Sequence, residues 1–145
     1  MNSELRILKP TMRVAGSPKT VSASRGTQPK DIRSRSFRYA LRAVRLYQHL
    51  QKQKDGAAWI LGKQYLRAAT SIGANVEEAQ AGESRNDFIH KLGIARKETR
   101  ESLYWLSVLA ESELVSRKRL APLIRETEEL LNVITSIILS TRRKD

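Results

Sequence analysis

Apolar positions recur at spacings of three and four along most of the chain beyond residue 30, a period typical of amphipathic helices. The pattern predicts helices over residues 31–54, 58–81 and 85–112, and a further helix that begins near residue 119. No segment alternates between apolar and polar positions as a strand would, and no internal repeat is present. Helices joined by such short connections predict an all-α fold, an antiparallel up-down-up-down four-helix bundle.

The first predicted helix carries more apolar surface than one core contact requires. Its main stripe is predicted to consist of Phe37, Ala40, Leu41, Val44 and Tyr47. The apolar arc is widened by Tyr39, Ala43, Leu46 and Leu50. A helix packed on one side needs a stripe of only about 100°. The excess predicts a second buried surface on this helix, such as a contact between subunits.

Each of the other predicted helices has a clear apolar row that is expected to face the core. The second row consists of Tyr65, Ala69, Ile72, Val76 and Ala79. The third row consists of Phe88, Leu92, Ala95, Thr99, Leu103, Leu106 and Ala110. The fourth row consists of Leu120, Leu123, Thr127, Leu130, Ile134, Ile137 and Thr141. Ser84, followed by Asp87, is expected to cap the third helix, and Gly82 to end the second.

The second predicted helix also contains a run of small side chains at residues 68–74. Gly73 lies in this run, and glycine in a helix interior costs about 1 kcal/mol relative to alanine. Small side chains allow two helix backbones to approach closely. We therefore expect Gly73 to mark a close contact with a neighbouring helix.

The charge of the chain indicates a polyanionic partner. The sequence has 27 Lys and Arg against 15 Asp and Glu, a net charge of +12. Residues 1–36 account for +6 of this excess. Residues 1–30 are rich in Pro, Ser and Thr and lack apolar periodicity, which predicts a disordered basic tail before a bundle over residues 31–145. This tail could be an organelle leader, an arm that holds nucleic acid, or a plain extension.

A row of basic side chains on the first predicted helix is the candidate site for that partner. At about 100° per residue, one narrow arc contains Arg35, Arg38, Arg42 and Arg45, together with His49. Such a row could lie along a nucleic-acid backbone and neutralise its phosphates, which would make binding sensitive to salt. The alternative is an ordinary solvated helix face. No aromatic side chains are interleaved for base stacking, so sequence-specific readout is not expected.

Several classes of chemistry are excluded by composition. The chain has no cysteine, so it can form no disulfide, thiolate zinc site, cysteine nucleophile or iron–sulfur cluster. No apolar run approaches the ~18 residues of a membrane span, and the first residues carry no secretory signal. We therefore expect a cytoplasmic protein without membrane contact.

The remaining motifs do not predict an active site. Residues 56–63 (GAAWILGK) miss the glycine spacing of a phosphate loop, and Asp87 with His90 forms only half of a di-iron carboxylate set. We expect no metal, no cofactor and no catalytic residue. One enzymatic alternative stays open, because Arg85 and His90 resemble the motif of HEPN-type ribonucleases. There the histidine acts as a base on a ribose hydroxyl and the arginine holds the phosphate.

Three segments carry a family resemblance: residues 66–80 (LRAATSIGANVEEAQ), 84–97 (SRNDFIHKLGIARK) and 98–111 (ETRESLYWLSVLAE). They resemble the bacterial 23S rRNA intervening-sequence, or four helix bundle, protein family over about residues 31–143. The resemblance implies an antiparallel four-helix bundle that assembles into a ring-like homopentamer. A related branch is the accessory variability protein of diversity-generating retroelements, a basic pentamer that binds nucleic acid and a reverse transcriptase.

Charge pattern and resemblance together predict a non-enzymatic oligomer that binds RNA or DNA through backbone phosphates on a basic helix face. The family has no established catalytic residues, so the resemblance assigns none here. An alternative is a scaffold subunit for another protein, such as a reverse transcriptase. The ribonuclease based on Arg85 and His90 is the third hypothesis.

Overall fold

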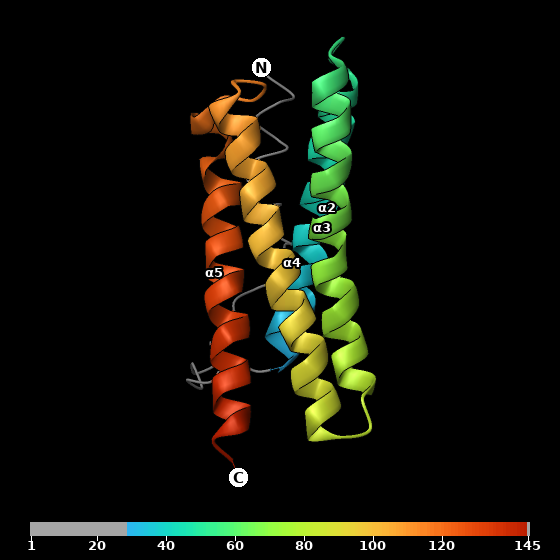
Figure 1. Ribbon diagram of the computed structural model, residues 1–145, viewed down its shortest axis with the longest axis vertical. Coiled ribbons are helices and arrows are strands. Elements are labelled where there is room, and N and C mark those ends of the chain that lie inside the picture. The colour runs from blue at the N-terminus through green and yellow to red at the C-terminus, as the bar shows by residue number, and fades with distance from the viewer. Residues whose placement is uncertain (1–28, 145) are drawn as a thin grey trace, which may run out of the picture.

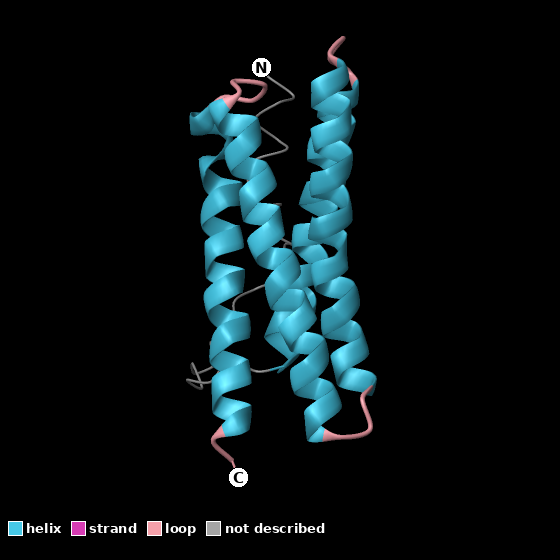
Figure 2. Cartoon of the chain, viewed as in Figure 1, coloured by secondary structure: helices cyan, strands magenta, loops and turns pink. Residues whose placement is uncertain are grey.

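The computed structural model describes residues 29–144, and they form an all-helical four-helix bundle (Figure 1). The helices are α2 (Pro29–Gln51), α3 (Gly56–Ala81), α4 (Arg85–Glu111) and α5 (Arg117–Arg142). They run alternately up and down, and the part of the chain described here contains no strand (Figure 2). The predicted fold class is confirmed. Most of the predicted tail lies outside the described residues, and α2 begins at Pro29, two residues before the predicted bundle boundary.

Polar side chains cap three of the helices at their first turns. The Asp55 carboxylate accepts from the backbone N–H of Ala57 at 2.8 Å, at the start of α3. The Ser84 hydroxyl accepts from the N–H of Asp87 at 3.1 Å, so the predicted cap of α4 is confirmed. Ser116 caps α5 in the same way. Gly82 ends α3 with an extended backbone at φ −63°, not in the left-handed conformation that favours glycine.

Neighbours in the sequence are the closest neighbours in the bundle. Helix α3 packs on α2 and α4, and α4 packs on α5, whereas the backbones of α2 and α5 come close at few points. The predicted core rows of α3, α4 and α5 face inward, apart from Phe88, Leu103 and Thr141, which are half-buried. None of the four described helices has a stretch long and apolar enough to cross a membrane.

The predicted core stripe of α2 is wrong. The buried row consists of Ile32, Tyr39, Ala43, Leu46 and Leu50, four of which were predicted only to widen the arc. In the main predicted stripe, Phe37 is 64% exposed, Leu41 41% and Val44 38%. Both rows are apolar and helical in period, so the sequence alone does not distinguish the row that faces α3 and α5.

Buried hydroxyl groups connect α3, α2 and α5 at the centre of the core. Tyr65 Oη donates to Tyr39 Oη at 2.9 Å, and Tyr39 Oη lies 2.6 Å from Thr127 Oγ1. Thr127 Oγ1 also lies 2.7 Å from the Leu123 carbonyl oxygen, to which it donates. A hydroxyl has one hydrogen, so Tyr39 is the donor to Thr127. Burial is the main cause that raises the pKa of Tyr39 to about 12 and that of Tyr65 well above 10.0.

Helix α3 approaches α2 closely at Gly73, as the sequence predicted, and its tightest glycine position is Gly62, against the Leu50 side chain. A Cβ at Gly62 would lie 2.9 Å from Leu50 Cδ1, closer than side-chain contacts allow. A Cβ at Gly73 would lie 3.4 Å from the Ser36 carbonyl oxygen, which is an ordinary contact. The expected proximity of the helices at Gly73 is therefore present, but alanine would fit there.

Candidate nucleic-acid interface

The predicted arginine row of α2 is divided between the seam with α5 and the outer surface. Arg35 is half-buried in the seam, where its Nε donates to Glu126 Oε1 at 2.7 Å and its Nη2 to Oε2 at 3.1 Å. Arg35 also pairs with Glu129. The hydrogen bond that Arg35 donates to Glu126 is the main cause that raises the pKa of Arg35 above its ordinary value. Arg35 thus links α2 to α5 with a bidentate ion pair.

Arg42 is also removed from the outer surface. It is only 6% exposed, and burial is the main cause that lowers the pKa of its guanidinium. Arg38 is exposed and Arg45 is half-exposed, and within residues 29–144 neither has an acidic partner. The expected solvent-facing row of four arginines is therefore wrong in its geometry. Of the four arginines, Arg38 and Arg45 are the two that remain exposed or half-exposed.

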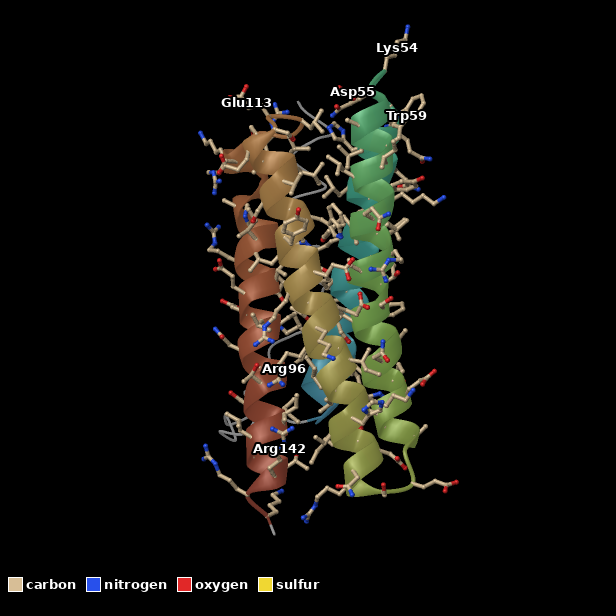
Figure 3. The ribbon with its side chains drawn as sticks, in the orientation of Figure 1. Lys54, Asp55, Trp59, Arg96, Glu113 and Arg142 are labelled. Carbon is tan, nitrogen blue, oxygen red and sulfur yellow. The ribbon has the colours of Figure 1, made fainter. Side chains whose placement is uncertain are left out.

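A second basic region, not expected from the sequence, lies where α4 and the end of α5 meet. It is a groove of about 330 Å³ lined by Asn86, Ile89, His90, Gly93, Ile94, Arg96, Lys97 and Arg142. Figure 3 shows Arg96 and Arg142 together in the lower half of the bundle, on the side of the α4–α5 seam. We refer to these eight residues as the α4–α5 groove. Its lining contains no acidic residue.

Positive charge predominates over the described bundle as a whole. Residues 29–144 contain 22 Lys and Arg against 13 Asp and Glu. Several carboxylates are already engaged in ion pairs, including Glu77 with Arg33, Glu78 with Lys91, and Glu101 with Arg67. In each of these pairs the hydrogen bond from the basic partner is the main cause that lowers the pKa of the carboxyl. The internal pairing therefore leaves an excess of cations on the surface.

The two residues of the HEPN-like motif lie in the first turns of α4 and have different surroundings. Arg85 points to the end of α5, where its Nη2 donates to the Lys144 carbonyl oxygen at 3.4 Å. His90 is exposed and lines the α4–α5 groove. The residues described here contain no cluster of three or more His, Asp or Glu side chains suited to a metal ion. Residues 56–63 lie in the first turns of α3, which Asp55 caps.

An exposed apolar face on α2 borders a shallow groove against α3. The exposed row of Phe37, Leu41 and Val44 is hereafter called the α2 row. Beside it lies a groove of about 230 Å³, lined by Arg33, Ser36, Phe37, Ala40, Thr70, Gly73, Ala74 and Glu77. The Arg33–Glu77 ion pair, at 2.9 Å, is exposed and also lines the groove. A contiguous row of exposed apolar side chains is typical of surfaces that bind another protein.

Sequence reasoning missed the α4–α5 groove because its cations come from two helices far apart in the chain. The adjacent pair Arg96–Lys97 and the basic run at residues 142–144 were both visible. An antiparallel alignment of the last two predicted helices would have brought the two basic segments to the same end of the bundle.

Comparison with known proteins identifies similarity to one family. The family model described as 23S rRNA-intervening sequence protein matches residues 29–136. A solved structure of a protein of unknown function from Bacteroides thetaiotaomicron VPI-5482, described as a member of the S23 ribosomal protein family, is 37% identical. The match covers 76% of this chain and 96% of that one, with a TM-score of 0.72. No curated protein sequence matches the chain.

Proposed function

The chain belongs to the 23S rRNA-intervening sequence protein family, and from this premise we propose that it is a non-enzymatic oligomer that binds RNA or DNA through backbone phosphates. The observation that carries the proposal is the excess of cations that remains on the bundle after its internal ion pairs are formed. Arg38 and Arg45 are the arginines of the predicted row that remain exposed or half-exposed on α2 without an acidic partner among residues 29–144. Their spacing of two helical turns suits contacts to phosphates along one strand.

Charge reversal on α2 tests this proposal. We expect Arg38→Glu/Arg45→Glu to weaken binding of a labelled single-stranded RNA and to reduce the slope of log K against log salt by about 1.4, because ~0.7 is lost for each phosphate contact. The matched control is Lys54→Glu/Lys63→Glu, which changes the net charge equally at exposed positions after the C-terminal end of α2 and on α3. An equal effect in both double variants would remove α2 from the interface.

We propose that a second copy of the chain covers the α2 row. The exposed Phe37, Leu41 and Val44 support this, as does the homo-oligomer implied by the family resemblance. Light scattering should give a mass several times 16.5 kDa, and about five times that value for the pentamer. Phe37→Glu/Leu41→Glu should reduce this mass towards that of one chain. Leu139→Glu, at an exposed position on α5, is the control and should not change it.

The α2 row also favours a second candidate function, a scaffold subunit for a different protein such as a reverse transcriptase. In that case a protein partner would be retained in a pull-down after nuclease treatment and lost with Phe37→Glu. RNA affinity would then be weak in the isolated chain. Binding of RNA by the purified protein with a steep salt dependence would favour the nucleic-acid function instead.

A cleavage assay separates the binding function from the ribonuclease alternative. We expect labelled RNA to remain intact with the wild-type protein and with His90→Ala alike. Cleavage by the wild type that is lost in His90→Ala would overturn the non-enzymatic assignment, because His90 would then act as the base.

A further inference from the structure

The α4–α5 groove brings polar groups of complementary kinds to one place. Arg96, Lys97 and Arg142 supply cationic donors from two helices, and Asn86 and His90 supply further hydrogen-bonding groups. No carboxylate lies in the lining to neutralise these cations. A ligand that fits this set therefore carries an anionic group of its own.

Arg96 supplies a second, independent indication of an anionic ligand. Its Nε atom is buried and has no hydrogen-bond partner among the residues that the structure describes. A buried donor without an acceptor is unfavourable, so a rotation of the Arg96 side chain that brings its Nε–H to a ligand oxygen in the groove would recover the lost interaction. Guanidinium groups match phosphate oxygens in geometry, often with two parallel hydrogen bonds.

Two aliphatic side chains and one open position add apolar surface to the lining of the groove. Ile89 and Ile94 contribute its aliphatic surface, and a Cβ added at Gly93 would meet no atom within 4 Å. The volume of about 330 Å³ lies at the lower end of the range for small-molecule sites. A flat ring can rest on this aliphatic surface beside the cations, whereas a free inorganic anion would leave the aliphatic surface uncovered.

We propose that the α4–α5 groove binds one nucleotide unit, with the phosphate at Arg96, Lys97 and Arg142 and the base over Ile89, Gly93 and Ile94. Asn86 and His90 then contact the sugar or the edge of the base. The inference rests on the proposed nucleic-acid function, and it adds a discrete site to an otherwise non-specific phosphate contact. The unit is either a free mononucleotide or one nucleotide of a single strand.

Nuclear magnetic resonance distinguishes these two sources. The ¹⁵N-labelled full chain is titrated with uridine 5′-monophosphate, uridine, inorganic phosphate and a short oligouridylate. We expect the monophosphate or the oligonucleotide to shift the amides of residues 86–97 and the Nε–H signal of Arg96. Uridine, which lacks the phosphate, should leave them unchanged. Shifts with the oligonucleotide alone assign the site to a strand, and shifts with neither overturn the proposal.

Charge reversal at Lys97 and Arg142 provides the matched test. Lys97→Glu/Arg142→Glu, both at exposed positions, should weaken binding of the shifting ligand at least about tenfold, whereas Lys54→Glu/Lys63→Glu should leave it unchanged. The two control positions lie near the opposite end of the bundle, where Lys54 is labelled in Figure 3. Equal losses in both double variants would overturn the groove as a discrete site.

The same variants separate failure of the groove from failure of the proposed function. The inference fails and the proposed function stands if the RNA affinity of Lys97→Glu/Arg142→Glu equals that of the control while the RNA affinity of Arg38→Glu/Arg45→Glu is lower. If the wild type binds no RNA at low salt, the proposed function fails. The mononucleotide titration then still decides whether the groove takes a free nucleotide.

Discussion

Removal of the Tyr39 hydroxyl should destabilise the bundle more than removal of the Tyr65 hydroxyl. Tyr39 occupies the middle of the buried chain, where it accepts from Tyr65 and donates to Thr127. In Tyr39→Phe the Tyr65 O–H loses its acceptor while it remains buried. In Tyr65→Phe the Tyr39 O–H still donates to Thr127, and only one of its acceptor positions is vacated.

The expected difference in the free energy of unfolding between the two variants depends on which buried group loses its partner. A buried donor left without an acceptor costs about 1–3 kcal/mol, and loss of an ordinary hydrogen bond costs about 1 kcal/mol. We expect Tyr39→Phe to lower the free energy of unfolding by about 2–3 kcal/mol and Tyr65→Phe by about 1 kcal/mol. Both side chains are fully enclosed, at 1% and 0% exposure, so water cannot replace the lost partner.

Urea unfolding followed by circular dichroism at a fixed protein concentration measures both values. Thr127→Val is a third variant of similar shape, and it should resemble Tyr39→Phe because it removes the acceptor of the Tyr39 proton. Equal losses in the two tyrosine variants, or a larger loss in Tyr65→Phe, would refute the direction that we assign to the hydrogen bonds.

Three further predictions concern pH and backbone geometry. The pKa of Tyr39 is raised to about 12 and that of Tyr65 well above 10.0, so both hydroxyls stay protonated in the folded chain at a pH where they ionise in the unfolded chain. The free energy of unfolding should therefore be constant below pH 10 and fall as pH rises towards 12, by about 1.4 kcal/mol per pH unit for each tyrosine. Urea midpoints that stay constant from pH 9 to 11 would contradict the burial of both hydroxyls. Gly62→Ala should lower the free energy of unfolding by about 1–3 kcal/mol through overpacking. Gly73→Ala should leave the free energy of unfolding unchanged or raise it by up to about 1 kcal/mol. Urea unfolding ranks the two variants, and the opposite order would contradict the geometry. Glu113 has a left-handed backbone at φ 60°, so Glu113→Gly should stabilise the bundle by about 1 kcal/mol, seen as a higher thermal midpoint, and a lower midpoint would contradict this.

The helices could be predicted from the sequence because their signals are local. The predicted helix over residues 85–112 corresponds to α4 (Arg85–Glu111), and Ser84 caps it as expected. Spacing of apolar residues and the identity of a capping residue depend on neighbours within a few positions. The order and direction of the helices then followed from the short connections.

The surface of α2 could not be predicted in the same way because it depends on distant residues. Tyr39 is buried through contacts with Thr127, 88 positions away, and Arg35 pairs with Glu126, 91 positions away. A helical wheel treats Tyr39 and Phe37 as equivalent apolar residues and Arg35 and Arg38 as equivalent cations. The partner helix decides which of each pair faces the core and which remains at the surface.

The candidate site depends on distant residues as well. Arg96 and Arg142 line one groove because α4 and α5 are antiparallel, although 46 positions separate them in the sequence. Net charge predicted a polyanionic partner, and it carried no information about where the unpaired cations gather. The structure places Arg38 and Arg45 on the outer side of α2 and groups Arg96, Lys97 and Arg142 in the α4–α5 groove.

The salt dependence of RNA binding by the full wild-type chain tests the central claim most directly. If Arg38, Arg45 and two cations of the groove each contact a phosphate, the slope of log K against log salt should be about −3 for a single strand. Fluorescence anisotropy of a labelled oligonucleotide across a salt series measures it. Measurable binding at low salt with a slope near this value is the expected result. Absence of binding at the lowest salt, or an affinity that salt does not change, would contradict the account.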